Sequence, residues 1–488
     1  MFHRPNGIAS GVRPKAKRAL VVFATLLFAW LWSLPVHAKI AKLTTLYSFQ
    51  GSFGGPDGVM PVAKLLQARD GNFYSTTSAG GESINCNPPG CGTVFRITAS
   101  GHLTTLWSFD GLFGEGPATG LVEGVGDFYG TTAGGGGPGK TGTLYRVTQD
   151  GLQMTVLHSF DDDHGGASPS GDLIVSDSKF YGTAAYGGEF NMGTVYSSTQ
   201  EGSVNVLYAF DTTHGAAPIA GLVEGPDGMF YGTTAAGGNQ NLGTVFKIAR
   251  TGVLTTLHAF KGSDGSGPGA ELILGSDGRF YGTTVSGGPS NGGTTFRITA
   301  GGQLTTLHSF SGPDGMRPYA ALFQARDGNF YGTTAHGRSS TNCTFGCGTI
   351  FKLTAAGHLT TLHSFDGWDG AQPMASLILA DDDKFYGTTM YGGSLDAGTV
   401  FKLVYLKSTN APTFDPPGGK YADSVTVTIS DTTPGATIYY TTDGSIPTRE
   451  SAQYTNPLTL TKKTALRAFA VAGKLLDSPL TAGNYRIK

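Results

Sequence analysis

The stretch Phe330-Tyr331-Gly332-Thr333-Thr334 occurs, with small changes, seven times in this chain. Its Tyr stands at positions 74, 129, 181, 231, 281, 331 and 386, at intervals of 50 to 55 residues. A second motif, Gly348-Thr349-Ile350-Phe351-Lys352 in the same copy, also recurs seven times. A period of about 50 residues is typical of the four-stranded blades of a β-propeller.

Each repeat carries the signals of four short strands, which in one copy are residues 320–323, 330–334, 348–353 and 359–365. Tight turns that contain Gly, such as Asp327-Gly328, separate these runs and favour antiparallel hairpins. The sequence therefore predicts an all-β fold made of four-stranded sheets.

The order of the motifs predicts how the repeats close. The fourth-strand motif occurs first at residues 43–49, before any other part of a repeat, whereas the last repeat lacks it. We therefore expect residues 43–49 to complete the seventh blade, so that residues 39–404 form a closed seven-bladed β-propeller without an open edge. A solenoid of seven stacked sheets is the alternative, but it would leave that strand unpaired.

The composition agrees with this fold and excludes one class of partner. The chain has 488 residues, of which 76 are Gly and only 14% are charged. Strands joined by many tight turns require such a Gly content. The formal net charge is -2, and no run of Lys and Arg follows residue 18, so we expect no nucleic-acid partner.

The N-terminus has the pattern of an export signal. Several Lys and Arg precede an apolar run at residues 19–34, and small residues end at Ala38. We expect cleavage after Ala38 and a secreted, extracellular or periplasmic protein, expected to be a monomer without a membrane span in the mature chain. An uncleaved membrane anchor is the alternative, although sixteen residues are short for a bilayer.

The pattern changes after the last repeat. Residues 405–411 form a polar linker, and residues 412–488 contain runs with the period of two that is typical of strands, at residues 424–429, 436–441 and 464–470. We expect a separate small β-sandwich.

These motifs resemble two known families. The recurring Phe-Tyr-Gly-Thr-Thr and Gly-Thr-Val-Phe-Lys units over residues 42–404 are similar to the GloVer-type (choice-of-anchor) tandem repeats of exported bacterial proteins. The tail, with Pro416-Pro417-Gly418-Gly419 and Tyr439-Tyr440-Thr441-Thr442-Asp443-Gly444, resembles the C-terminal domain of chitobiase and β-hexosaminidase. The first resemblance implies architecture only, and the second implies an accessory module without catalytic residues.

Four cysteines in an exported chain predict disulfides. Cys86 with Cys91, and Cys343 with Cys347, each lie inside a lengthened loop of one repeat. Pairing across the two loops, or a zinc site made of four thiolates, remains open as an alternative but would require separated blades to touch.

The strand directions place two sets of loops together on one end of the sheets, which we call the top face. A residue followed by Gly recurs there four residues after each fourth-strand Phe, namely Phe53, Phe113, His164, His214, Asp264, Asp314 and Asp369. These side chains either form tight turns, as Asp-Gly pairs do, or make a rim of ligands for a cation or sugar hydroxyls. His158, His258, His308 and His363 share a strand position with Tyr and Trp in other repeats, which indicates packing.

An arc of aromatic residues is the predicted binding site. Trp368, Phe53 and Phe113 lie on consecutive loops, and Tyr391 lies within the same arc. Aromatic faces stack well on sugar rings. We expect a binding protein for a glycan or another extracellular polymer. No cofactor and no metal are assigned, and calcium stays possible although no specific motif supports it.

Two other classes stay open. A glycoside hydrolase or polysaccharide lyase would need a pair of loop carboxylates, and a structural adhesion or envelope scaffold would need no particular loop. No Gly-x-Ser-x-Gly, His-Glu-x-x-His or phosphate-loop motif in its proper context is present, so no catalytic residue is assigned.

Overall fold

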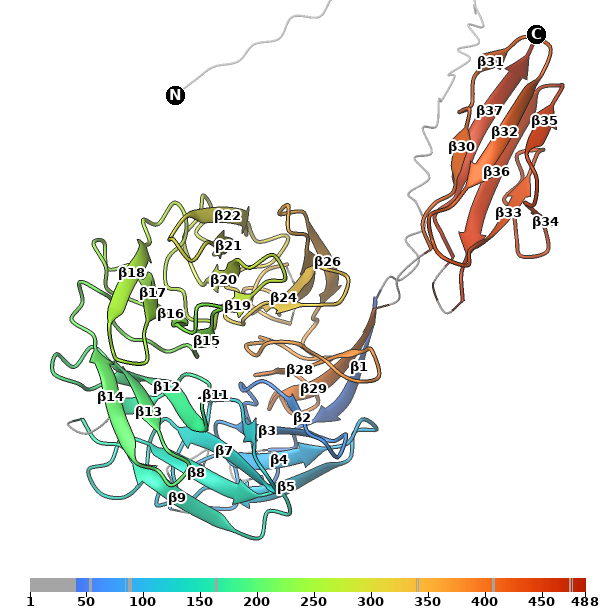
Figure 1. The fold of residues 1–488 in the computed structure, drawn as a ribbon. Coiled ribbons are helices and arrows are strands. Elements are labelled where there is room, and N and C mark those ends of the chain that lie inside the picture. The colour runs from blue at the N-terminus through green and yellow to red at the C-terminus, as the bar shows by residue number, and fades with distance from the viewer. Residues whose placement is uncertain are drawn as a thin grey trace, which may run out of the picture. The chain divides into compact units, whose positions relative to one another are not determined.

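The computed structural model describes residues 41–51, 55–83, 85–86, 90–162, 166–338, 340, 342–405, 409–473, 475 and 477–488. The predicted signal peptide, Phe53 and His164 lie outside the described residues. Within these residues every regular element is a strand, and the sheets up to residue 405 lie around a common centre (Figure 1). The fold is all-β and propeller-like.

The described part of the repeat region forms seven antiparallel sheets, each numbered here in chain order. Sheets 1 to 3 contain β2 (Leu66–Gln67), β3 (Phe73–Thr77), β4 (Thr93–Ile97) and β5 (Leu103–Ser108); β6 (Val122–Glu123), β7 (Asp127–Thr132), β8 (Thr143–Thr148) and β9 (Met154–Ser159); and β10 (Ala167–Pro169), β11 (Ile174–Ser176), β12 (Lys179–Tyr186), β13 (Thr194–Ser198) and β14 (Val204–Ala209).

Sheets 4 to 6 follow the same order. They contain β15 (Val223–Glu224), β16 (Phe230–Thr234), β17 (Thr244–Ile248) and β18 (Leu254–Ala259); β19 (Ile273–Leu274), β20 (Phe280–Thr284), β21 (Thr294–Ile298) and β22 (Leu304–Ser309); and β23 (Phe323–Gln324), β24 (Phe330–Thr334), β25 (Thr349–Leu353) and β26 (Leu359–Ser364).

Sheet 7 combines both ends of the repeat region. It contains β27 (Ile378–Leu379), β28 (Phe385–Thr389), β29 (Thr399–Tyr405) and, as its outer strand, β1 (Ala41–Ser48). β1 runs antiparallel to β29, with Leu43 opposite Leu403. The predicted pairing of the first strand with the last repeat is therefore present.

The Phe-Tyr motif packs neighbouring sheets together. The Tyr ring of each sheet lies against the Phe ring of the next, with centroids 3.9 to 4.8 Å apart. The series returns to its start, because Tyr386 of sheet 7 lies 4.3 Å from Phe73 of sheet 1. Each pair buries aromatic surface and favours a tilted or offset geometry. The recurring motif is thus an interface between sheets.

The remaining residues of the motif have local duties, which sheet 5 illustrates. The Tyr281 hydroxyl donates to Asp277 in the preceding turn (2.9 Å), and the Thr284 and Thr294 hydroxyls bond across the strands (2.9 Å). The Thr283 hydroxyl donates to the Ala320 carbonyl of sheet 6 (3.2 Å). Because the three Thr hydroxyls are buried, their hydrogen bonds remove the cost of unsatisfied polar atoms.

The Gly of the motif leaves room for an aromatic ring. A Cβ at Gly282 would lie 2.6 Å from the Phe296 ring of the neighbouring strand. Such a contact requires the ring to move, so the strand uses Gly despite its weak strand preference. The first repeat has Ser75 in this position, and its hydroxyl donates to the Lys64 carbonyl (3.1 Å).

The inner strands differ from the prediction. Residues 320–323 were expected to form a strand, but β23 comprises only Phe323 and Gln324. The Ala320 carbonyl is taken by the Thr283 hydroxyl of the neighbouring sheet instead of a ladder partner. Crowding at the centre therefore replaces strand pairing with contacts between sheets.

The tail forms two further sheets. One contains β30 (Thr413–Asp415), β32 (Val425–Ser430) and β35 (Leu458–Leu460); the other contains β31 (Lys420–Tyr421), β37 (Thr481–Ile487), β36 (Thr464–Val471), β33 (Thr437–Thr441) and β34 (Ala452–Gln453). Val427 of the first sheet and Leu466 and Tyr485 of the second belong to one buried cluster. Among the described residues, no helix has the length and apolar character needed to cross a membrane.

Candidate functional site

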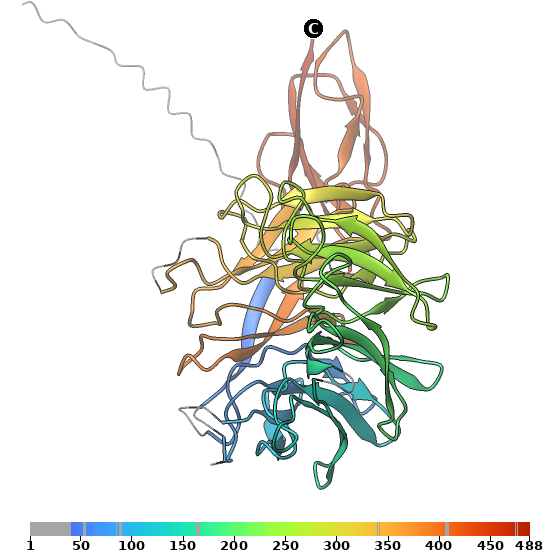
Figure 2. The same ribbon diagram turned by 90° about the vertical axis from the view of Figure 1, so that its left-hand side faces the viewer.

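Two sets of loops meet at one end of the sheets, as the strand directions predict. The loop that enters each sheet pairs with the loop between its second and third strands, for example Met316 with His336 and Ala371 with Tyr391. Figure 2 shows the sheets from the side. The predicted top face is formed by these loops.

Three of the predicted rim residues share one arrangement. Asp264, Asp314 and Asp369 each accept a hydrogen bond from a backbone N–H of their own turn at 2.8 to 3.0 Å. Their second oxygen contacts Nε2 of the fourth-strand His at 2.7 to 2.9 Å. One carboxylate oxygen is engaged by the turn and the other by the strand His, which explains why His and Asp recur six residues apart.

The electrostatics of these pairs follow from the same contacts. Burial alone raises the pKa of the Asp314 carboxyl, but the Ser311 N–H and the His308 ring outweigh burial and lower it. The pKa of Asp369 is lowered in the same way by His363 and the Asp366 N–H. The ionised carboxylate is therefore the form that the folded turn stabilises.

The other rim residues behave differently. His214 contacts the Asp211 carboxylate of its own turn through Nδ1 (2.9 Å), whereas the strand position that holds His in the three Asp repeats holds Tyr208 here. Phe113 is half-buried against Trp107, with centroids 5.5 Å apart. Neither residue repeats the contact between a turn Asp and a strand His.

Three loops on sheets 6 and 7 are hydrogen-bonded to one another, and we call residues 342–348, 365–373 and 390–398 the loop arc. The Asn342 amide donates to the Asp366 carbonyl (2.7 Å), and the Gly393 N–H donates to the Gly367 carbonyl (2.9 Å). The central loop carries Trp368 and is thus held from both sides.

The loop arc exposes apolar side chains around a pocket. Trp368 and Phe345 are each 72% exposed, and Leu395 is 54% exposed. A pocket of about 390 Å³ opens here, lined by His336, Asn342, Cys343, Thr344, Phe345, Gly346, Ala371, Gln372, Tyr391 and Asp396. Trp368 and Tyr391 of the predicted arc therefore lie on adjoining loops.

Both predicted disulfides are present. Cys86 bonds Cys91, and Cys343 bonds Cys347, with Cα atoms 5.5 and 5.3 Å apart. These pairings exclude the cross-loop pairs and the four-thiolate zinc site. Phe345 lies between the second pair, so an aromatic residue inside a short disulfide loop was the sequence signal that the prediction missed.

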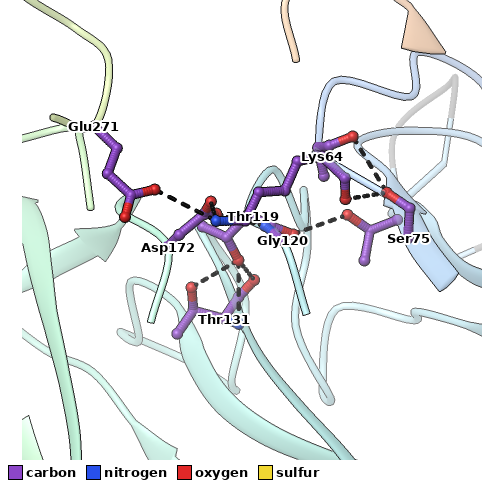
Figure 3. A network of polar contacts seen from close by, with 9 residues as sticks. Lys64, Ser75, Thr119, Gly120, Thr131, Asp172 and Glu271 are labelled. Atoms are coloured by element: carbon purple, nitrogen blue, oxygen red, sulfur yellow. Dashed lines mark hydrogen bonds and ion pairs between the residues drawn. The ribbon is translucent and has the colours of Figure 1, made fainter. Parts of the chain in front are cut away.

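A charged cluster at the centre of the sheets was not predicted. The Lys64 ammonium lies 2.8 Å from Asp172 and 3.3 Å from Glu271, although these residues belong to sheets 1, 3 and 5 (Figure 3). They line a cavity of about 140 Å³ to which all seven sheets contribute. Asp172 also accepts a hydrogen bond from the Gly120 N–H of sheet 2 (2.6 Å).

The sequence signal for this cluster is a position that varies. The residue before the recurring inner Leu is Lys64, Gly120, Asp172, Gly221, Glu271, Ala321 and Ser376 in the seven repeats. Three charged residues in a slot otherwise filled by small residues distinguish it. Among the described residues, no three His, Cys, Asp or Glu side chains gather as a metal site.

Several solved structures are distantly similar to this chain. Similar solved structures include a fungal alcohol oxidase of the AA5 family in complex with copper, at 13% identity over 91% of this chain and 98% of that one, with a TM-score of 0.49. Another is the GH74 enzyme of Niastella koreensis, at 13% identity over 90% of this chain and 69% of that one, with a TM-score of 0.47.

A further similar structure is the extracellular domain of a protein described as a hybrid two-component system from B. thetaiotaomicron. Its identity is 11%, its TM-score is 0.47, and the match covers 91% of this chain. The chain spans 57% of the length of that structure. No curated protein matches the sequence.

Two family models match the chain. Residues 416–482 match the chitobiase/beta-hexosaminidase C-terminal domain, which confirms the resemblance seen in the tail. The Gloeobacter/Verrucomicrobia repeat matches residues 36–169, 88–278 and 221–446, which together cover most of the chain. The disulfides fit an extracellular or periplasmic protein of this kind. The chain thus belongs to the family of the Gloeobacter/Verrucomicrobia repeat.

Proposed function

We propose that this protein is an exported binding protein that holds a glycan or another extracellular polymer on the loop arc. The observation that carries the proposal is the exposure of Trp368 and Phe345 on interlocked loops beside a pocket. The exposed Phe345 ring meets the ring of the pocket residue His336 edge-on, with centroids 6.0 Å apart. Exposed apolar groups that gather at a pocket favour a binding role.

The size and lining of the pocket suit a sugar. Its volume of about 390 Å³ falls within the roughly 300 to 1,000 Å³ of small-ligand sites. Tyr391 and Phe345 offer aromatic faces, and Gln372 and Asp396 add polar groups for hydroxyls. Aromatic rings bind sugar rings at low entropic cost because few torsions must be fixed.

The architecture that we propose for this function is a closed seven-bladed propeller, residues 39–404, followed by a linker and a β-sandwich at residues 412–488. The contact of Tyr386 with Phe73 and the pairing of β1 with β29 support closure. A closed ring holds its loops in fixed positions, which favours a preformed site.

The test begins with a glycan array probed with the mature protein, with and without calcium. Trp368→Ala, Phe345→Ala and Tyr391→Ala are then measured against the glycan that binds. We expect Trp368→Ala to weaken binding about tenfold or more, since aromatic residues that become buried on binding dominate such interfaces.

Phe190→Ala is the matched control, because Phe190 is a 50% exposed aromatic residue on a top-face loop of sheet 3. It should leave binding unchanged, and every variant should melt like the wild type. Unchanged affinity in all three arc variants, or equal loss in the control, would show that the loop arc is not the site.

An enzyme is the second candidate, because two carboxylates converge at the centre. Asp172 and Glu271 both contact Lys64. A glycoside hydrolase likewise needs two carboxyl groups that face the same bond of the substrate. However, Lys64 occupies the space between them, and the cavity of about 140 Å³ is smaller than ligand sites usually are. Binding is therefore favoured, while a structural scaffold predicts that no variant of the loop arc changes any interaction.

A further inference from the structure

The central cluster breaks the repetition of the sheets. Four repeats place Gly, Ala or Ser in the slot before the inner Leu, whereas Lys64, Asp172 and Glu271 occupy it in sheets 1, 3 and 5. Asp172 and Glu271 lie 108 and 207 residues after Lys64 along the chain, and only the tertiary fold brings the three together.

The three groups form one connected unit. Lys64 Nζ lies 2.8 Å from Asp172 Oδ2 and 3.3 Å from Glu271 Oε2. The side chains keep between 22% and 34% of their surface, because they border the cavity instead of the packed core. Figure 3 shows the ammonium between the two carboxylates.

The charges of this unit do not cancel. With Lys64 protonated and both carboxylates ionised, the described lining of the cavity carries one surplus negative charge. Tyr319 is its only other titratable group, and the remaining described lining residues are Val, Ala, Gly, Ser, Ile and Met. No second cation in this lining offsets the surplus.

Geometry assigns the surplus to Glu271. Asp172 has the shorter contact with Lys64 and a second hydrogen bond from Gly120, so its charge is doubly supported. Glu271 has the longer contact with Lys64. Among the hydrogen bonds and ion pairs of the described residues, its side chain has no second partner. An ionised carboxylate that is largely removed from water is costly unless it is well paired.

We propose that Lys64, Asp172 and Glu271 form a proton-binding ion cluster between sheets 1, 3 and 5. Glu271 takes up one proton in mild acid, and this uptake makes the folded protein more stable. The proton adds to a Glu271 carboxylate oxygen from solvent. Lys64 and Asp172 then remain as a neutral ion pair, and no surplus charge stays in the cavity.

The electrostatics agree with this geometry. Burial raises the pKa of the Glu271 carboxyl, the Lys64 ammonium opposes this, and the negative charge of Asp172 adds to it. Burial lowers the pKa of Lys64, but the two carboxylates outweigh it and raise the pKa, so Lys64 stays protonated. A carboxyl whose pKa is raised on folding stabilises the fold at low pH, and this stability is lost as the pH rises through the folded pKa.

The test compares melting temperatures of the mature protein between pH 5 and pH 8. Any other group that changes its charge in this range is present in every variant, so the quantity measured is the pH-dependent shift of the wild type minus that of each variant. We expect Glu271→Gln to lose part of the gain in melting temperature that the wild type shows on acidification, because the variant has no carboxyl group at this position to take up a proton.

A second variant removes the surplus charge from the other side. Asp172→Asn leaves Lys64 and Glu271 as a neutral pair, so the pKa of Glu271 should fall and the gain at pH 5 should disappear as well. Glu115→Gln, at an exposed loop position, is the control and should keep the full shift of the wild type.

The outcomes distinguish the proposal from an ion cluster whose protonation does not change between pH 5 and pH 8. If Glu271→Gln keeps the pH-dependent shift of the wild type, or if Asp172→Asn increases that shift, Glu271 does not take up the proton and the proposal is overturned. Loss of the shift in both variants, with the control unchanged, supports it.

Discussion

The interfaces between sheets and the loop arc on sheets 6 and 7 are built in opposite ways. Every interface repeats a Tyr ring against a Phe ring, from Tyr231 and Phe280 at 3.9 Å to Tyr129 and Phe180 at 4.8 Å. In the loop arc the residue before the turn Asp is Trp368, whereas it is Ser263 and Pro313 in the two preceding loops.

Loop closure shows the same contrast. In sheets 4 and 5, Asn241 and Asn291 close the loop between the second and third strands by accepting a hydrogen bond from a Gly N–H at 2.8 Å. In sheet 6 the bond between Cys343 and Cys347 lies in this place, and the loop is longer and carries Phe345. Repetition thus builds the scaffold, while exceptions mark the candidate site.

The largest expected effect comes from breaking the interface where the two ends of the repeat region meet. Deleting residues 43–49 removes β1 from β29 and takes away Phe49, which is fully buried. We expect a loss of more than about 5 kcal/mol in the free energy of unfolding, because β29 becomes an unpaired edge strand and a core side chain is lost. Thermal melting and limited proteolysis measure it.

The control for this deletion is the protein that lacks only residues 1–38. A truncated protein that melts at the same temperature as this control would mean that β1 does not hold sheet 7 together.

A smaller effect is expected inside one repeat. Gly282→Val places methyl groups where the Phe296 ring lies 2.6 Å from the Cβ position. Overpacking of this kind costs about 1 to 3 kcal/mol, which urea denaturation resolves. Gly301→Ala is the matched control, since the nearest atom to its Cβ position is 3.8 Å away. Equal stability of the two variants would contradict the packing role of the motif Gly.

A loss of stability similar to that of Gly282→Val is expected in the loop arc. Replacing Cys343 and Cys347 together by Ser should cost about 2 kcal/mol, because the disulfide closes a very short loop. Binding to the glycan found on the array should weaken as well, since Phe345 lies inside this loop. Replacing Cys86 and Cys91 by Ser should cost a similar amount of stability but leave binding unchanged, and equal loss of binding in both pairs would argue against the loop arc.

Much of the scaffold could be predicted because its signals are local and repeated. The strands that begin at Phe330 and Leu359, the turn at Asp327 and the pairing of Cys343 with Cys347 all rest on contacts within one repeat. The inner strands could not be predicted as well, because their carbonyl groups serve Thr hydroxyls of neighbouring sheets.

The candidate site was predicted only where single residues stood out. Trp368 and Tyr391 could be placed on one arc, since the order of repeats fixes which loops adjoin. Phe345 and Leu395 were missed, because an apolar residue in a loop reads as ordinary packing until its exposure is known. Phe113, by contrast, was included in the arc although its ring packs on Trp107.

The sequence alone determined the all-β class, the repeat, the pairing of the first strand with the last sheet and both disulfides, because these depend on patterns that recur or on neighbours in the chain. The tertiary structure decided which unique residues meet. Lys64 contacts Asp172 and Glu271 only because sheets 1, 3 and 5 border one central cavity. A charge that occurs once in a repeated slot has no partner in the sequence pattern, and distance along the chain says nothing about distance across the centre.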